Sequence, residues 1–115
     1  MLPQNKTATV VTDLNAYQAH AMRSAIYPDQ GSNLVYPVLG LANEAGEVAG
    51  KLKKQIRDKV ERSHDLRQEL GDVLWYVAAV ASELGVTLSD IATENIAKLS
   101  SRQARGTLSG DGDQR

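Results

Sequence analysis

The sequence contains one long apolar stretch, Val73-Leu74-Trp75-Tyr76-Val77-Ala78-Ala79-Val80-Ala81, which directly follows Glu69-Leu70-Gly71-Asp72. Wound as a helix, this stretch is apolar on every side, and such a helix must be covered on every side. A chain of four short helices leaves at least one face of each helix open. The pattern therefore predicts a helix that packs within its own chain and also against a second copy, in an obligate dimer or a dimer of dimers.

Four segments show apolar residues at helical spacing, and no segment shows the alternation of a β-strand. Residues 27–33 are rich in turn-forming residues and predict a loop. Residues 53–62 are highly charged and predict a solvated helix end followed by a connection. Ser63 suits a helix cap, and Thr87 with Asp90 resembles a capping box. The chain is thus expected to be all-α, an antiparallel four-helix bundle-type domain, with helices near 12–25, 33–52, 64–83 and 88–105.

Composition divides the chain into an N-terminal arm (1–11), a helical domain (12–105) and a flexible C-terminal tail (106–115) that is rich in Gly, Ser and Asp. Lys and Arg total 13 against 14 Asp and Glu, so charge gives no argument for a nucleic-acid partner. The absence of Cys excludes disulfides and a thiolate nucleophile. No apolar run is long enough to span a membrane or to form a signal peptide. We therefore expect a cytoplasmic protein with no membrane partner.

Two pairs of acidic residues lie in the second and third predicted helices. Glu44 and Glu47 are three residues apart, and so are Glu69 and Asp72. Residues at i and i+3 share a helix surface, so antiparallel packing can gather all four carboxylates. Mg²⁺ prefers such oxygen ligands. From spacing alone, a metal site and a set of ordinary solvated acids are equally good interpretations.

The surroundings of these acids carry a family resemblance. Glu44-Ala45-Gly46-Glu47 followed by Glu69-Leu70-Gly71-Asp72 resembles the ExxE…ExxD signature of the MazG-like all-α NTP pyrophosphohydrolases, and Asn95-Ile96-Ala97-Lys98-Leu99 with Arg102 resembles their downstream motif. Many relatives carry two adjacent acids at the start of the first motif, where this chain has Asn43. That departure leaves open how many metal ions are bound.

The resemblance implies hydrolysis of a (d)NTP to the (d)NMP and pyrophosphate, for cleansing or adjusting nucleotide pools. Glu44, Glu47, Glu69 and Asp72 would be the catalytic and metal-binding residues, with Mg²⁺ as the cofactor and Mn²⁺ as a substitute. Water would attack the α-phosphorus, and any one of the four acids could serve as its base.

Further residues are candidates for binding the nucleoside triphosphate. Lys98 and Arg102 lie at i and i+4, and both suit phosphate oxygens, although cations at a helix end also suit its dipole. Asn95 lies one turn earlier, and Lys54 is a weaker phosphate candidate. Tyr76 follows Asp72 by one turn and fits either a stacked base or a buried interface. Gln18 and His20 are candidates for reading a base edge.

Three other interpretations stand beside this one. A phosphoribosyl-ATP pyrophosphatase would perform the same reaction on a different substrate. A non-catalytic helical dimerisation or nucleotide-binding module is favoured only by Asn43. A structural bundle with solvent-facing acids predicts that Mg²⁺ leaves the melting temperature unchanged.

Overall fold

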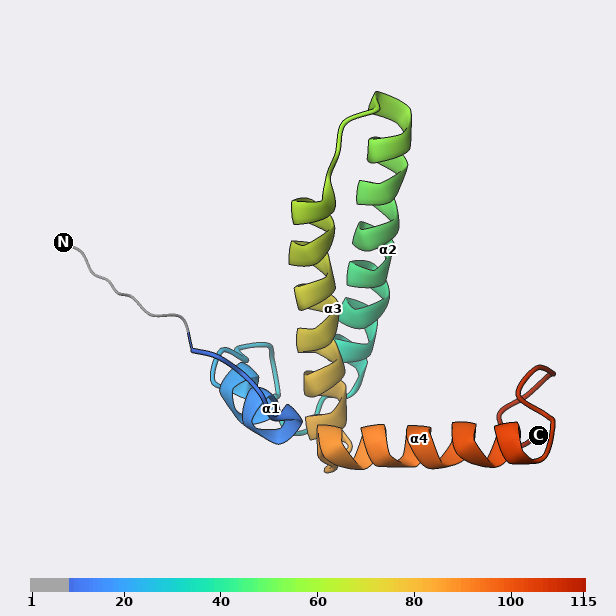
Figure 1. The fold of residues 1–115 in the computed structure, drawn as a ribbon. Helices are drawn as coiled ribbons and strands as arrows, with labels where there is room; N and C mark the ends of the chain where they lie inside the picture. The colour runs from blue at the N-terminus through green and yellow to red at the C-terminus, as the bar shows by residue number, and fades with distance from the viewer. Residues whose placement is uncertain (1–8) are drawn as a thin grey trace.

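A computed structural model of the chain describes residues 9–115, and its regular structure there is entirely helical, which confirms the all-α class. Most of the arm predicted for residues 1–11 lies outside the described residues. The elements are α1 (Leu14–Met22), α2 (Val35–Asp58), α3 (Ser63–Glu83) and α4 (Leu88–Ala104) (Figure 1).

The body of the molecule is an antiparallel hairpin of α2 and α3, which lie side by side over most of their length (Figure 1). The charged segment 53–62 contains the predicted helix end and connection, because α2 continues to Asp58 and α3 begins at Ser63. Lys, Arg and Gln are good helix formers and need no core to pack against. The helix ends where Lys59 adopts a left-handed conformation with a φ of 55°. Ser63 is the first residue of α3 and does not cap it, since the N-cap is Arg62.

The short helix α1 packs across the C-terminal half of α3. Asp13 caps it by accepting hydrogen bonds from two backbone N–H groups. Alanines at the contact let the backbones approach closely, with Ala21 against Ala78 and Ala81 in a buried cluster. Gln18 is buried in the same joint. Its amide donates to Ser82 Oγ and the Val86 carbonyl, and its carbonyl accepts from the Leu88 N–H. Gln18 therefore joins three helices, and its side chain is not free to read a base.

The loop that follows α1 is held by one carboxylate. Glu83, the last residue of α3, accepts a 2.5 Å hydrogen bond from the Tyr27 hydroxyl and further bonds from the backbone N–H groups of Gly31 and Asn33. The buried ring of Tyr27 stacks on Tyr36 of α2 at 5.0 Å. The loop thereby connects the end of α3 with the start of α2.

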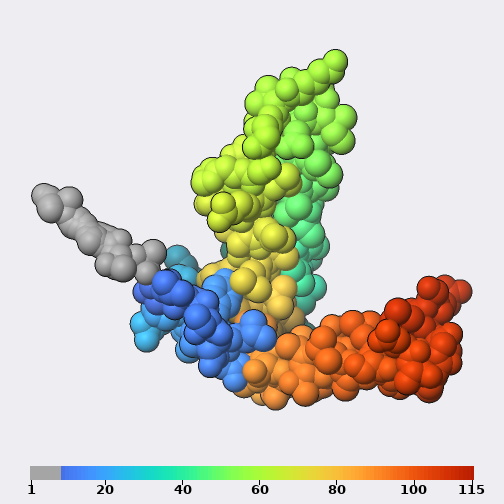
Figure 2. Space-filling model, in the orientation of Figure 1, coloured from blue at the N-terminus to red at the C-terminus, as the bar shows by residue number. Residues whose placement is uncertain are grey.

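Helix α4 leaves the hairpin as an arm, which differs from the antiparallel four-helix bundle-type domain that the sequence predicts. Its axis makes an angle of 98° with α3, and among the described residues it contacts α1 and α3 but not α2 (Figures 1 and 2). The turn that sets this direction contains Gly85 with a φ of 73° and the capping box of Thr87 and Asp90. The chain has a radius of gyration of 17.5 Å, whereas a compact chain of 100 residues has one of about 13 Å.

Because the bundle is open, many large apolar side chains on the helices are exposed to solvent. Those more than half exposed include Val35, Leu39, Ile56, Leu70 and Ile96. Within residues 9–115, no helix is by itself both long and apolar enough to cross a membrane, and α3 and α4 reach that threshold only as a sharply bent pair.

Candidate metal centre and active site

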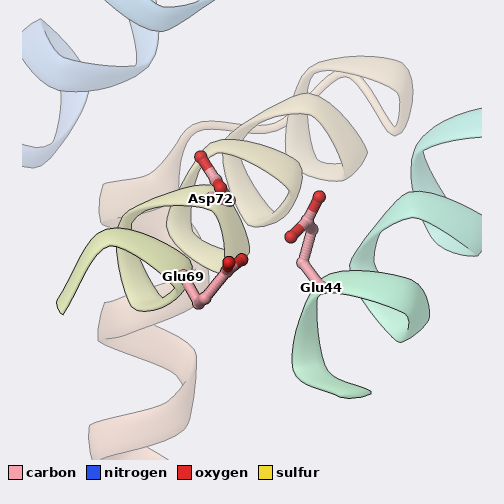
Figure 3. A group of neighbouring side chains, drawn as sticks. All are labelled: Glu44, Glu69 and Asp72. Atoms are coloured by element: carbon pink, nitrogen blue, oxygen red, sulfur yellow. The ribbon is translucent and has the colours of Figure 1, made fainter. Parts of the chain in front are cut away.

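Three acids of the two motif helices meet between α2 and α3. Glu44 projects from α2 toward Glu69 and Asp72, which lie one turn apart on α3 (Figure 3). One carboxylate oxygen from each residue lies within 4.8 Å of the others. The sequence places Glu69 and Asp72 on one surface, and the hairpin brings Glu44 opposite them.

The three carboxylates repel one another. The pKa of Glu44 is raised above its ordinary value, first by burial, then by the charge of Asp72 and by a hydrogen bond with Glu69 and its charge. Glu47 adds a smaller effect in the same direction. A divalent cation would relieve this repulsion, and three hard oxygen donors are the ligands that Mg²⁺ prefers. The donor set therefore fits a magnesium ion.

A cavity of about 340 Å³ opens beside the acids, and its volume lies within the range of small-molecule sites. Glu44 and Asp72 line its polar side, and Trp75 and Tyr76 line its aromatic side, together with Ser24. The indole N–H of Trp75 donates to Ser24 Oγ and to the Ala21 carbonyl, which fixes the ring against the end of α1. Trp75 is thus half-buried and forms a wall of this cavity.

Tyr76 and Tyr17 lie near the acidic cluster, and Tyr36 lies beside Tyr76. Burial, followed by the influence of Tyr36 and of the acids Glu44 and Asp72, raises the pKa of Tyr76. Burial and the charge of Asp72 raise the pKa of Tyr17 on α1. Sequence reasoning assigned no role at the site to Tyr17 or Tyr36, because both come from outside the motif segments. The only signal available was the helical spacing of Tyr17 on α1.

Comparison with known families identifies the chain. The MazG nucleotide pyrophosphohydrolase domain matches residues 36–106. The chain belongs to this family. It is also 46% identical over 112 residues to the Gene 37 protein of Mycobacterium phage L5, which covers 89% of this chain and 98% of the phage protein. No solved structure gives a significant match.

The MazG match contains the acidic cluster, α3 and α4, whereas α1 and nearly all of residues 106–115 lie outside it. Two predicted site residues of α2 lie apart from the cluster. Glu47 is exposed and does not belong to the group of three acids, although it lies one turn after Glu44 on α2. Lys54 is exposed ten residues beyond Glu44, about 15 Å along the helix axis.

The predicted phosphate ligands of α4 do not meet the acids of the same MazG domain. Asn95 is exposed, and Lys98 and Arg102 are paired with Asp113 in the C-terminal segment. Residues 106–115, predicted to be a flexible tail, fold back on α4. Arg115 fastens this loop by donating to the carbonyls of Thr107, Leu108 and Gly112.

Proposed function

We propose that this MazG chain is a Mg²⁺-dependent nucleoside triphosphate pyrophosphohydrolase that converts a (d)NTP to the (d)NMP and pyrophosphate, with Mn²⁺ as a substitute ion, in the cytoplasm. The observation that carries the proposal is that Glu44, Glu69 and Asp72 converge from two helices. One carboxylate oxygen of each lies within 4.8 Å of the others. Ordinary solvated acids have no reason to gather at a helix contact, where each raises the cost of ionising the others.

Glu44, Glu69 and Asp72 would hold the metal, and Glu47 would join them through a change of side-chain rotamer or a bridging water. The bound metal supplies positive charge at the phosphate oxygens and lowers the pKa of the attacking water. Asn43 offers a neutral carbonyl where many relatives have a further acid. The chain would therefore hold its metal with less negative charge than those relatives.

The cavity beside the acids provides a place for the nucleoside. Trp75 presents an aromatic wall that is fixed by two hydrogen bonds, and the ring of Tyr76 adjoins Glu44. A base or sugar lying on this wall would place its phosphates toward the acids. Stacking on an aromatic face tolerates any base, so this contact binds nucleotides without choosing among them.

We also propose that the enzyme works as a homo-oligomer, a dimer or a dimer of dimers. An apolar groove lined by Leu70, Val73, Leu74 and Val77 runs along the outer face of α3, and Leu70 is 60% exposed. Exposed apolar surface of this kind marks an interaction site. Since α4 stands away from the acids of its own chain, its Asn95, Lys98 and Arg102 would serve the acidic cluster of a partner copy.

The reaction is tested by identifying products and the position of bond cleavage. A (d)NTP is incubated with the protein in ¹⁸O-labelled water, with Mg²⁺ or with EDTA. The proposal predicts pyrophosphate and a labelled monophosphate with Mg²⁺, and no turnover with EDTA. Orthophosphate and a nucleoside diphosphate would refute attack at the α-phosphorus.

A further inference from the structure

The two cations of α4 converge on a single carboxylate. Lys98 Nζ lies 3.1 Å and Arg102 Nη2 lies 3.2 Å from Oδ1 of Asp113. The same Nη2 donates a 2.5 Å hydrogen bond to the backbone carbonyl of Asp113. The C-terminal segment thus places an acidic side chain and a carbonyl where α4 presents its positive charge.

The partners in this contact differ in burial. The side chain of Arg102 is only 5% exposed, whereas that of Asp113 is 75% exposed. A buried guanidinium needs an anion, because an unpaired charge in such surroundings is strongly unfavourable. An exposed carboxylate, by contrast, gains little from an ion pair. Arg102 is therefore held in place by the fold, whereas another anion could take the place of Asp113.

The guanidinium of Arg102 also makes only some of the hydrogen bonds that it could donate. Its Nε is buried and has no hydrogen-bond partner among the described residues, and neither has the neighbouring Thr107 hydroxyl. The Nε and Nη2 groups form one edge of a guanidinium, which binds two oxygens of an oxyanion in parallel. Arg57 uses that edge on Asp58, with bonds of 2.7 and 2.9 Å. At Arg102, Asp113 engages Nη2 alone.

We propose that Lys98 and Arg102 form an oxyanion site that Asp113 occupies in the nucleotide-free protein, and that phosphoryl oxygens displace Asp113. The identity of the ligand as a nucleotide phosphate or pyrophosphate rests on the proposed function. A phosphoryl group fits better than the carboxylate, because it can satisfy Nε and Nη2 together while a further oxygen faces Lys98. Its higher charge also strengthens both contacts.

Displacement has a consequence for the C-terminal segment. Residues 106–115 are tied to α4 by Asp113 and by the Arg105 side chain, which donates to the Arg115 carbonyl. Loss of the Asp113 contacts would release this segment when the anion binds, and the returning carboxylate would help to expel pyrophosphate. Only the fraction of molecules with an open site binds the anion at full strength, so the internal occupant weakens the apparent affinity by that fraction.

The test is a calorimetric titration of the full chain with pyrophosphate in EDTA, so that the metal centre takes no part. Asp113→Asn should bind pyrophosphate at least ~5-fold more tightly than the wild type, because the competing charge is gone. Asp111→Asn is the matched control. It makes the same charge change in the same segment, and Asp111 has no ion pair among the described residues. Its affinity should stay within about twofold of the wild type, since exposed charges act weakly on one another.

A second measurement follows the segment itself. Amide hydrogen exchange in residues 107–115 of the wild type should accelerate when pyrophosphate is added. An equal gain in both variants would show a general charge effect and overturn the proposal. Unchanged or weaker binding by Asp113→Asn, or slower exchange on adding pyrophosphate, would show that Asp113 is a structural clamp. No outcome depends on turnover, so failure of the proposed reaction would be seen separately.

Discussion

Gly40 of α2 lies directly against the phenol ring of Tyr76 of α3, so closely that a Cβ at residue 40 would overlap the ring. This contact determines how near the two helices come. Gly40 lies one turn before Glu44, and Tyr76 lies one turn after Asp72. The close approach and the acidic cluster therefore occupy adjacent turns of the same helix pair.

Gly40→Ala should push Tyr76 away and separate Glu44 from Asp72. We expect a loss of about 1–3 kcal/mol in stability, as for overpacked cores, together with weaker metal binding. Gly50→Ala is the control, because a Cβ there meets nothing within 4 Å. It should stabilise the helix by about 0.5–1 kcal/mol. Urea melts of both variants, with and without Mg²⁺, measure the difference, and equal effects would contradict the role given to Gly40.

Glu44→Gln should stabilise the metal-free protein. The folded-state pKa of Glu44 is raised, so the folded state binds its proton more tightly and stability falls as pH rises from the ordinary carboxyl range through that pKa. Glu44→Gln removes the ionisable group and with it this loss of stability. For a partly solvated group we expect a gain on the order of 0.5 kcal/mol in the free energy of unfolding. In EDTA the variant should melt above the wild type at pH 7.5, with a smaller difference at pH 4.5. Mg²⁺ should reverse the order, and a variant less stable than the wild type in EDTA would argue against carboxylate repulsion.

Tyr27→Phe should loosen the loop between α1 and α2 while keeping the stacking on Tyr36. We expect a loss of about 1 kcal/mol, the usual net value of a hydrogen bond, measured by thermal melting. Tyr36→Phe is the control that keeps the ring and leaves the Glu83 contact intact. If Tyr27→Phe melts like the wild type, the hydrogen bond to Glu83 does not anchor this loop.

The contact between Tyr27 and Glu83 should weaken at both extremes of pH. The hydrogen bonds that Glu83 accepts lower its pKa. The contribution of Glu83 to the stability of the loop is therefore lost as pH falls below the ordinary carboxyl range. Burial and Glu83 raise the pKa of Tyr27 from 10.0 to about 12, so its contribution is lost as pH rises across that interval. Hydrogen exchange of the Gly31 and Asn33 amides should be slowest, after correction for intrinsic rates, between these two windows.

Leu70→Glu should dissociate the proposed oligomer, because it puts a charge into the apolar groove of α3. Ile26→Glu is the matched control, since Ile26 is 92% exposed in a loop outside that groove. Light scattering should show at least ~10-fold weaker association for Leu70→Glu, the equivalent of about 1.4 kcal/mol, and none of this effect for Ile26→Glu. A monomeric wild type would contradict the oligomer.

Sequence periodicity was sufficient for the local structure. It predicted the loop at 27–33, the capping box of Thr87 and Asp90 and the all-round apolar α3, because each depends on residues close in the chain. The direction of α4 could not be predicted this way. It depends on the turn at Gly85 and on Gln18, which binds Leu88 from 70 positions away.

At the site too, local geometry could be predicted from the sequence, whereas most contacts between distant residues could not. The spacing of Glu69 and Asp72 predicted their shared surface, and antiparallel packing of the two motif helices predicted that Glu44 would meet them. Trp75 could not be recognised as a wall of the cavity, because its orientation is set by the Ala21 carbonyl and Ser24 of α1. Asp113 lies in a segment whose composition gave no indication of its contact with Arg102.

The most direct test of the proposed reaction is pyrophosphate release from a panel of ribo- and deoxyribonucleoside triphosphates with Mg²⁺. Glu69→Gln is compared with Asp65→Asn, which lies one turn earlier on α3 and outside the acidic cluster. We predict pyrophosphate with the matching monophosphate from the wild type and Asp65→Asn, and a loss of at least ~100-fold in Glu69→Gln, as for removal of a charge-stabilising group. Folded protein that releases pyrophosphate from no nucleotide, or equally from both variants, would contradict it.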